Sequence, residues 1–144
     1  MANKNLCIFI LIATIVAQAT WVRAAKDYQV GDFGEGYNGL GWDETTDLQA
    51  WVKGKEFNQG DRLYFGYKAG EHNVVVLADQ AALDSCTLTN PKIQSPSCGY
   101  NLITLSAGPN FITSGMGEDC KNGMKLKIDA KPAPALMKGR HLIL

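Results

Sequence analysis

The chain has 144 residues, which is enough for one domain with one hydrophobic core. Apolar residues make up 46% of it and charged residues 19%, a balance typical of a globular protein rather than a disordered one. The formal net charge is zero, so no basic excess indicates a nucleic-acid partner, and we expect none.

The first residues have the features of a secretory signal peptide. Lys4 gives a positive start, residues 6–17 form an apolar run, and small or aliphatic residues precede a predicted cleavage after Ala24. The alternative is a transmembrane anchor, but an anchor needs about 20 apolar residues and this run is shorter. We therefore expect a secreted protein. It has three predicted parts: a signal peptide (1–24), a domain (25–130) and a short tail containing Pro and Ala (131–144).

Short apolar segments alternate with closely spaced turn residues in the predicted domain. Strands are expected at residues 28–32, 55–57, 62–67, 72–77, 102–105 and 125–128. Short helical segments are expected at 46–51, capped by Thr46 or Asp47, and at 80–85. A Gly-Pro turn is expected at 108–109, and residues 87–99 are expected to be irregular because prolines interrupt them. This pattern predicts an all-β Greek-key sandwich of about seven or eight strands with one or two short helices.

A loop of small and polar residues, 114–124, lies between the last predicted strands and carries a Ser, an Asp, a Cys and a Met. Four motifs precede it in order: Tyr-x-Val-Gly-Asp at 28–32, Gly-Trp at 41–42, Lys-x-Phe at 55–57 and His-Asn-Val at 72–74. Together these features resemble the phytocyanins, the small blue-copper proteins of plants, over residues 28–130. The resemblance implies the cupredoxin-like form of the Greek-key sandwich.

The resemblance also implies where copper ligands would lie: at His72, Ser114, Asp119 and Met124. A blue-copper centre uses two imidazoles, one thiolate and a weak axial thioether. Only His72 and Met124 keep the ligand type, because a serine hydroxyl is a poor donor to Cu(I) and a carboxylate is a hard donor. We therefore expect no intact metal site and no cofactor. A hydrogen-bonded His72–Asp119 pair is expected in place of the ion, because the groups at these positions bind the same ion in a metal-bearing relative.

Export makes disulfides permissible, and three cysteines remain once the signal peptide with Cys7 is removed. One bridge at most can form within a monomer, which leaves one thiol. The resemblance implies that Cys86 pairs with Cys120. Cys98 departs from the family pattern. We expect a tolerated buried or capped thiol and a mostly monomeric protein; the alternative is an intermolecular bridge that would allow a dimer.

Two functions compete. The first is a secreted, non-catalytic protein of the plant cell surface or apoplast, similar to the early nodulin-like members, with a binding, signalling or wall-associated role toward an extracellular protein or polysaccharide. The alternative is a copper-binding electron-transfer protein with an altered ligand set, His72, Asp119 and Met124. An enzyme is not expected, because no nucleophile-elbow or oxyanion motif accompanies the His, Asp and Ser. No membrane anchor is expected either, because only three apolar residues follow Arg140.

Overall fold

Two β-sheets and two short helices form the domain, which spans Ala25–Ala133. The computed structural model describes residues 23–36 and 38–133, so nearly all of the predicted signal peptide and most of the predicted tail lie outside the described residues. The elements in chain order are β1 (Asp27–Gln29), α2 (Leu48–Val52), β2 (Phe57–Asn58), β3 (Arg62–Gly66), β4 (Val75–Leu77), α3 (Gln80–Ser85), β5 (Ile93–Gln94), β6 (Tyr100–Thr104), β7 (Gly108–Thr113) and β8 (Lys125–Lys131).

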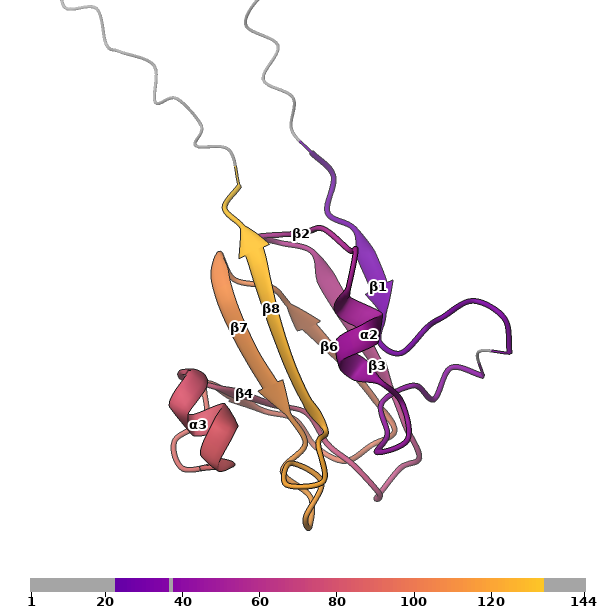
Figure 1. Cartoon of the computed structure of the whole chain (residues 1–144), viewed down its shortest axis with the longest axis vertical. Helices are drawn as coiled ribbons and strands as arrows, with labels where there is room; N and C mark the ends of the chain where they lie inside the picture. Colours follow the sequence, from indigo (N-terminus) through magenta and orange to yellow (C-terminus); the bar gives the residue numbers. More distant parts are fainter. Residues whose placement is uncertain (1–22, 37, 134–144) are drawn as a thin grey trace, which may run out of the picture. The chain divides into compact units, whose positions relative to one another are not determined.

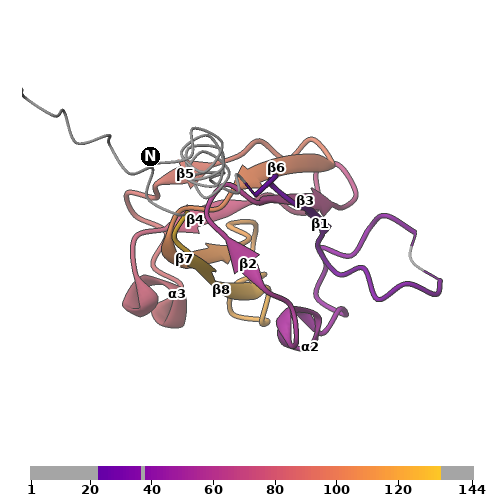
Figure 2. The same ribbon diagram turned by 90° about the horizontal axis from the view of Figure 1, so that it is seen from above.

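The smaller sheet has the strand order β1-β3-β6 and the larger sheet the order β2-β8-β7-β4-β5. Figure 2 shows β1, β3 and β6 in one layer and β2, β7 and β8 in the other. The longest ladder joins β7 to β8, from Gly108 opposite Ala130 to Thr113 opposite Lys125. The predicted all-β sandwich of seven or eight strands with one or two short helices is confirmed. No helix in the described part of the chain is long and apolar enough to cross a bilayer.

The main core lies between the sheets and follows from the period-2 alternation of the strands. On β8, Leu126, Ile128 and Ala130 point inward and are buried, while the intervening residues are exposed. Trp42 and Trp51 are both fully buried. The Trp42 ring meets Phe65 edge-on, with centroids 4.9 Å apart. The two tryptophans are thus large apolar anchors of this core.

A second, smaller core lies where α3 packs against β4 and β7 (Figure 1). Its buried members are Val75, Leu77, Leu83 and Phe111. The valine-rich β4 is therefore buried on both faces. Asp79 caps α3 by accepting the Ala82 N–H at 2.8 Å. At α2 the cap is Asp47, which accepts the Ala50 N–H at 2.9 Å, and this decides between the two predicted caps.

Two predicted loops are wrong in detail. Gly108 and Pro109 do not form a turn; they begin β7, and Pro109 pairs with Asp129. The pairing of β4 with β7 ends at Phe111, so Pro109 has β8 as a neighbour but no strand on its other side. A proline is tolerated at such an edge position, because its missing N–H breaks no ladder hydrogen bond there. Within the expected irregular segment 87–99, Ile93 and Gln94 form β5 at the edge of the larger sheet. A two-residue strand is too short for its period to be read from sequence.

Candidate functional site

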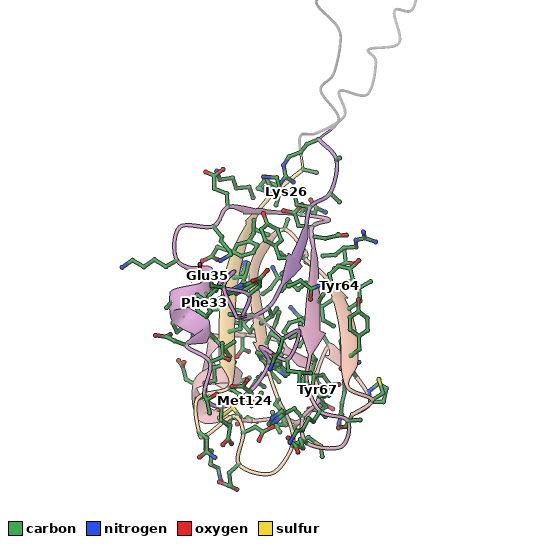
Figure 3. All side chains as sticks on the ribbon, turned by 90° about the vertical axis from the view of Figure 1, so that its right-hand side faces the viewer. Lys26, Phe33, Glu35, Tyr64, Tyr67 and Met124 are labelled. Atoms are coloured by element: carbon green, nitrogen blue, oxygen red, sulfur yellow. A yellow bond between two sulfur atoms is a disulfide. The ribbon has the colours of Figure 1, made fainter. Side chains whose placement is uncertain are left out.

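The loop 114–124 connects β7 to β8 and lies at one end of the domain. His72 lies three residues before the first residue of β4, and β4 pairs with β7, so the sheet brings His72 beside the loop. Figure 3 shows Tyr67 and Met124 at this end and Lys26 at the opposite end. The disulfide between Cys86 and Cys120, with Cα atoms 5.8 Å apart, ties the loop to the end of α3. The predicted pairing is present.

The centre of the site is the carboxylate of Asp119. Its Oδ2 atom lies 2.8 Å from His72 Nδ1, and the Ser114 hydroxyl donates to the same oxygen. Because a carboxylate oxygen can only accept, Nδ1 is the protonated nitrogen of the imidazole. The side chains of His72 and Asp119 are 13% and 10% exposed, and Ser114 is fully buried. The predicted His72–Asp119 contact is present, and Ser114 completes a hydrogen-bonded cluster of three.

Asn73 is a part of the site that our interpretation of the sequence missed. Its side-chain oxygen accepts the Gly115 N–H at 2.6 Å, and its own backbone N–H donates to the Ser114 hydroxyl at 3.3 Å. Its carbonyl oxygen accepts the indole N–H of Trp42 at 2.9 Å. Asn73 thus joins the segment before β4 to the loop 114–124 and to the core. Its place directly after His72 in the His-Asn-Val motif was the available signal.

The backbone and ring of His72 are also held by neighbours. The Ser97 hydroxyl donates to the carbonyl oxygen of His72, and the Tyr67 ring meets the imidazole edge-on with centroids 6.2 Å apart. The pKa of Tyr67 is raised, first by burial and then by the nearby Cys98 thiol. Cys98 itself is a free, exposed thiol whose sulfur lies 3.2 Å from the Tyr100 carbonyl oxygen. It is thus neither buried nor bridged within the described chain.

A pocket of about 180 Å³ opens beside His72. Its lining residues are Asn38, Leu40, Trp42, Asp43, Tyr67, Lys68, Glu71 and His72. The Asp43 carboxylate in its wall accepts hydrogen bonds from the backbone N–H groups of Thr45 and Thr46 at 2.7 and 2.8 Å. Burial alone would raise the pKa of Asp43, but the hydrogen bonds from these threonines outweigh burial and lower it. Asp43 therefore stabilises the fold above its unfolded pKa, and that contribution disappears as the pH falls through the lowered folded value.

Met124 has a different setting from the three polar groups. It is fully buried and belongs to the main hydrophobic core. Its carbonyl oxygen accepts the Thr113 hydroxyl at 2.7 Å, which fixes the start of β8 against the end of β7. Met124, at the family's axial ligand position, thus packs as a side chain of the hydrophobic core.

The cluster does not have the arrangement of a nucleophilic triad. In such a triad the imidazole lies between the hydroxyl and the carboxylate and removes the hydroxyl proton. Here the carboxylate of Asp119 lies in the middle, and the buried Ser114 hydroxyl donates to it directly. Ser114 is therefore not activated by His72.

The residues present do not fit a type 1 copper ion. No thiolate is offered, and the Nδ1 proton of His72 is engaged by Asp119. Among the described residues, the only buried side-chain nitrogen or oxygen without a partner is Trp51 Nε1, which is not a ligand position. That part of the chain also holds no group of three or more His, Cys, Asp or Glu arranged for a metal. The polar atoms that would face an ion satisfy one another instead.

Comparisons with known proteins agree with this architecture. A family model described as a plastocyanin-like domain matches residues 42–124. The chain is also 34% identical to a basic blue protein of Arabidopsis thaliana over 119 residues, which is 83% of this chain and 84% of that protein. This chain belongs to the phytocyanins. Its predicted family is thereby confirmed.

Other relatives carry different names and lengths. This phytocyanin is 36% identical to a blue copper protein of Petunia hybrida over 76% of its own length, but the match spans only 39% of the petunia protein. It is 32% identical to early nodulin-like protein 22 of Arabidopsis thaliana, over 87% of this chain and 81% of that one.

Two solved structures share the fold. Cucumber basic protein, a blue copper protein, is 31% identical with a TM-score of 0.58, over 72% of this chain and 98% of that one. Cucumber stellacyanin is 26% identical with a TM-score of 0.65, over 77% and 100%. The sandwich is therefore that of the plant cupredoxins.

Replacing Asp119 with alanine should lower the free energy of unfolding by about 2 kcal/mol, because the buried Ser114 hydroxyl and the His72 N–H then lose their common acceptor. Urea unfolding followed by tryptophan fluorescence measures the change. Glu118→Ala is the matched control, because Glu118 is the adjacent residue, is exposed, and forms a surface ion pair with Lys121. Equal midpoints for the two variants would show that the cluster does not hold the loop.

Proposed function

We propose that this phytocyanin is a secreted, non-catalytic protein of the plant cell surface or apoplast that acts by binding and has a degenerate copper site. The observation that carries the proposal is the position of Asp119, whose Oδ2 atom accepts from both His72 and Ser114. At two of the four family ligand positions, His72 and Ser114, the side chains are thus hydrogen-bonded to Asp119 at the third. The domain keeps the family fold, while the side chains at its ligand positions form hydrogen bonds with each other.

The chemistry of electron transfer supports the same conclusion. Copper cycles between two oxidation states in these proteins through a soft thiolate, and serine stands at that position. An ion entering the site would also have to displace a proton from His72 Nδ1 and separate the imidazole from Asp119. Both steps oppose binding, and neither is compensated by a thiolate bond.

Secretion is supported by two independent features. The N-terminal residues have the composition of a signal peptide. The Cys86–Cys120 bridge is a bond that persists in oxidising compartments and is rare in the cytosol. The binding role rests on the family, which includes early nodulin-like relatives, and on the loss of ligand chemistry in the site.

The test is a copper titration of the purified secreted protein, followed by visible absorption and metal analysis. The wild-type protein should stay colourless and bind no stoichiometric copper. The double variant Ser114→Cys and Asp119→His should become coloured through a Cu–thiolate bond, because the frame of the site is intact. Each protein is prepared in two forms, one with Cys98 intact and one with Cys98→Ser. In the second form the exposed thiol cannot supply a thiolate.

Two results would contradict the proposal. Stoichiometric copper in the wild-type protein would favour the alternative, an electron-transfer protein using His72, Asp119 and Met124. Intense Cu–thiolate absorption in the wild-type background with Cys98 intact, lost in Cys98→Ser, would place a copper site at the exposed thiol instead.

A further inference from the structure

The outer face of the smaller sheet carries apolar and polar side chains that are half-buried or exposed. The register places Tyr64 opposite Leu102, and Gly66 opposite Tyr100, across β3 and β6. On the other side of β3, Gln29 of β1 is the partner of Tyr64. Because side chains two residues apart share a face, these groups project outward together. We name this surface the Tyr64–Tyr100 face.

Aromatic and aliphatic groups form the middle of this face. Tyr100 is 50% exposed and Leu102 is 44% exposed. The Tyr64 and Tyr100 rings lie 5.7 Å apart between centroids, tilted by 47°. Tyr64 and Tyr100 are diagonal neighbours on this face, because Tyr64 is the partner of Leu102 and Tyr100 is the partner of Gly66. Contiguous exposed apolar groups of this kind mark interaction sites more often than isolated ones do.

Polar groups frame one end of the face in fixed positions. Arg62 donates two hydrogen bonds of 2.7 Å to the carboxylate oxygens of Asp27, and the Tyr64 hydroxyl donates to Asp27 at 3.3 Å. The hydrogen bonds from Arg62 lower the pKa of Asp27, so this pair stays charged and internally neutral. An exposed ion pair adds little stability. Its effect is to hold donors and acceptors next to Tyr64 with no net charge, and the guanidinium carbon of Arg62 lies over the Tyr64 ring, 5.8 Å from its centroid.

The other end of the face is closed by the loop that precedes Trp42. A Cβ atom added at Gly66 would lie 1.8 Å from the carbonyl oxygen of Gly39, so this loop lies directly over β3 at that point. The Tyr64–Tyr100 face is therefore a short platform with a polar frame at Asp27 and Arg62 and a backbone rim at Gly39. A long partner would cross it along β6, which has no second neighbouring strand among the described residues.

We propose that the Tyr64–Tyr100 face binds a neutral, extended glycan. Tyrosine rings suit the apolar faces of sugar rings, and the Asp27 carboxylate, the Arg62 guanidinium and the Gln29 amide suit hydroxyl groups. The proposal rests on the proposed function for its setting outside the cell, and it names the ligand class of that binding role.

Charge and size both favour a neutral glycan over other occupants. The neutralised Arg62–Asp27 pair offers no net attraction to an acidic polysaccharide or a charged peptide. The apolar part consists of three side chains, Tyr64, Tyr100 and Leu102, whereas a specific protein interface buries about 800 Å² on each partner. A few sugar rings would cover this platform, whereas the contact area of a protein partner would have to extend well beyond it.

Isothermal titration calorimetry with the secreted full-length chain tests this proposal. The probes are cellohexaose and mannohexaose, which are neutral, and hexagalacturonate, which is acidic. Tyr64→Ala and Tyr100→Ala remove the platform, and Tyr64→Phe keeps the ring if the alanine variant fails to fold. Phe33→Ala is the control, since Phe33 is 58% exposed on the loop that extends away from the sheets (Figure 1).

A neutral hexasaccharide should bind, hexagalacturonate should not, and each alanine variant should weaken binding by about tenfold or more. Phe33→Ala should leave the affinity unchanged. The proposal is overturned if neither neutral probe binds, if only the acidic probe binds, or if the tyrosine variants bind as wild type. Self-association lost in Tyr100→Ala, without glycan binding, would instead make the face a contact between copies.

Copper content measured on the same preparations keeps this result separate from the proposed function. Absent glycan binding in a copper-free protein would overturn the glycan proposal alone. Glycan binding by a protein that also holds stoichiometric copper would overturn the degenerate copper site and leave the glycan proposal standing.

Discussion

Replacing both Cys86 and Cys120 with serine should lower the free energy of unfolding by about 4 kcal/mol. The bridge closes a loop with a sequence separation of 34, and in the chain-entropy description a loop of that size restricts the unfolded state by about this amount. The bridge also attaches the residue after Asp119 to the end of α3, so its loss should loosen the polar cluster. Urea unfolding gives the change, and hydrogen exchange of the loop amides reports the local effect.

Cys98→Ser is the control for this experiment, because Cys98 is exposed and makes no bridge in the described chain. It should leave the free energy of unfolding within about 0.5 kcal/mol of the wild-type value. If the double variant does not fold, reduction of the folded wild-type protein provides the comparison. A reduced protein with unchanged stability would show that the bridge contributes nothing to the folded domain.

Replacing Asp61 with alanine should cost about 3 kcal/mol. Asp61 is fully buried, and its two carboxylate oxygens accept the backbone N–H groups of Lys26 at 2.8 Å and Asn58 at 2.9 Å. Its carbonyl oxygen accepts the Leu105 N–H at 2.8 Å. The side chain therefore ties the start of β1 to the turn after β2, next to the end of β6. Its removal leaves two donors without their charged acceptor, each worth roughly 1.5 kcal/mol.

The matched control for Asp61 is Asp129→Ala. Asp129 is an acidic residue of β8 that lies on the exposed side of its strand. Its replacement should change the unfolding free energy by less than about 0.5 kcal/mol. Similar losses in the two variants, measured by thermal and urea unfolding, would show that burial of Asp61 does not carry the effect.

Several properties of this phytocyanin follow from the sequence by itself. Alternation on β8 indicates which of its side chains are buried, because a strand presents successive residues to opposite faces. The ordered motifs from Tyr28 to Met124 indicate the family and therefore the four positions at which its copper ligands lie. They also imply the Cys86–Cys120 bridge and the His72–Asp119 contact, which are both present.

Other features were decided only by the tertiary structure. The sequence does not indicate which acceptor the Ser114 hydroxyl meets, and only the folded loop places it against the carboxylate of Asp119. Asp61 reads as one residue of a Gly-Asp turn, and its burial depends on β1 and β6 closing over it from distant parts of the chain.

The Tyr64–Tyr100 face was also decided only by the tertiary structure. Tyr64 and Tyr100 are 36 positions apart, and only the pairing of β3 with β6 places their rings together. Period-2 alternation in a sequence indicates that a side chain points outward, but it carries no information on the register of two strands distant in the chain. Register is settled by the packing of the whole sandwich, and so the glycan proposal depends on the tertiary structure, whereas the family could be recognised before it.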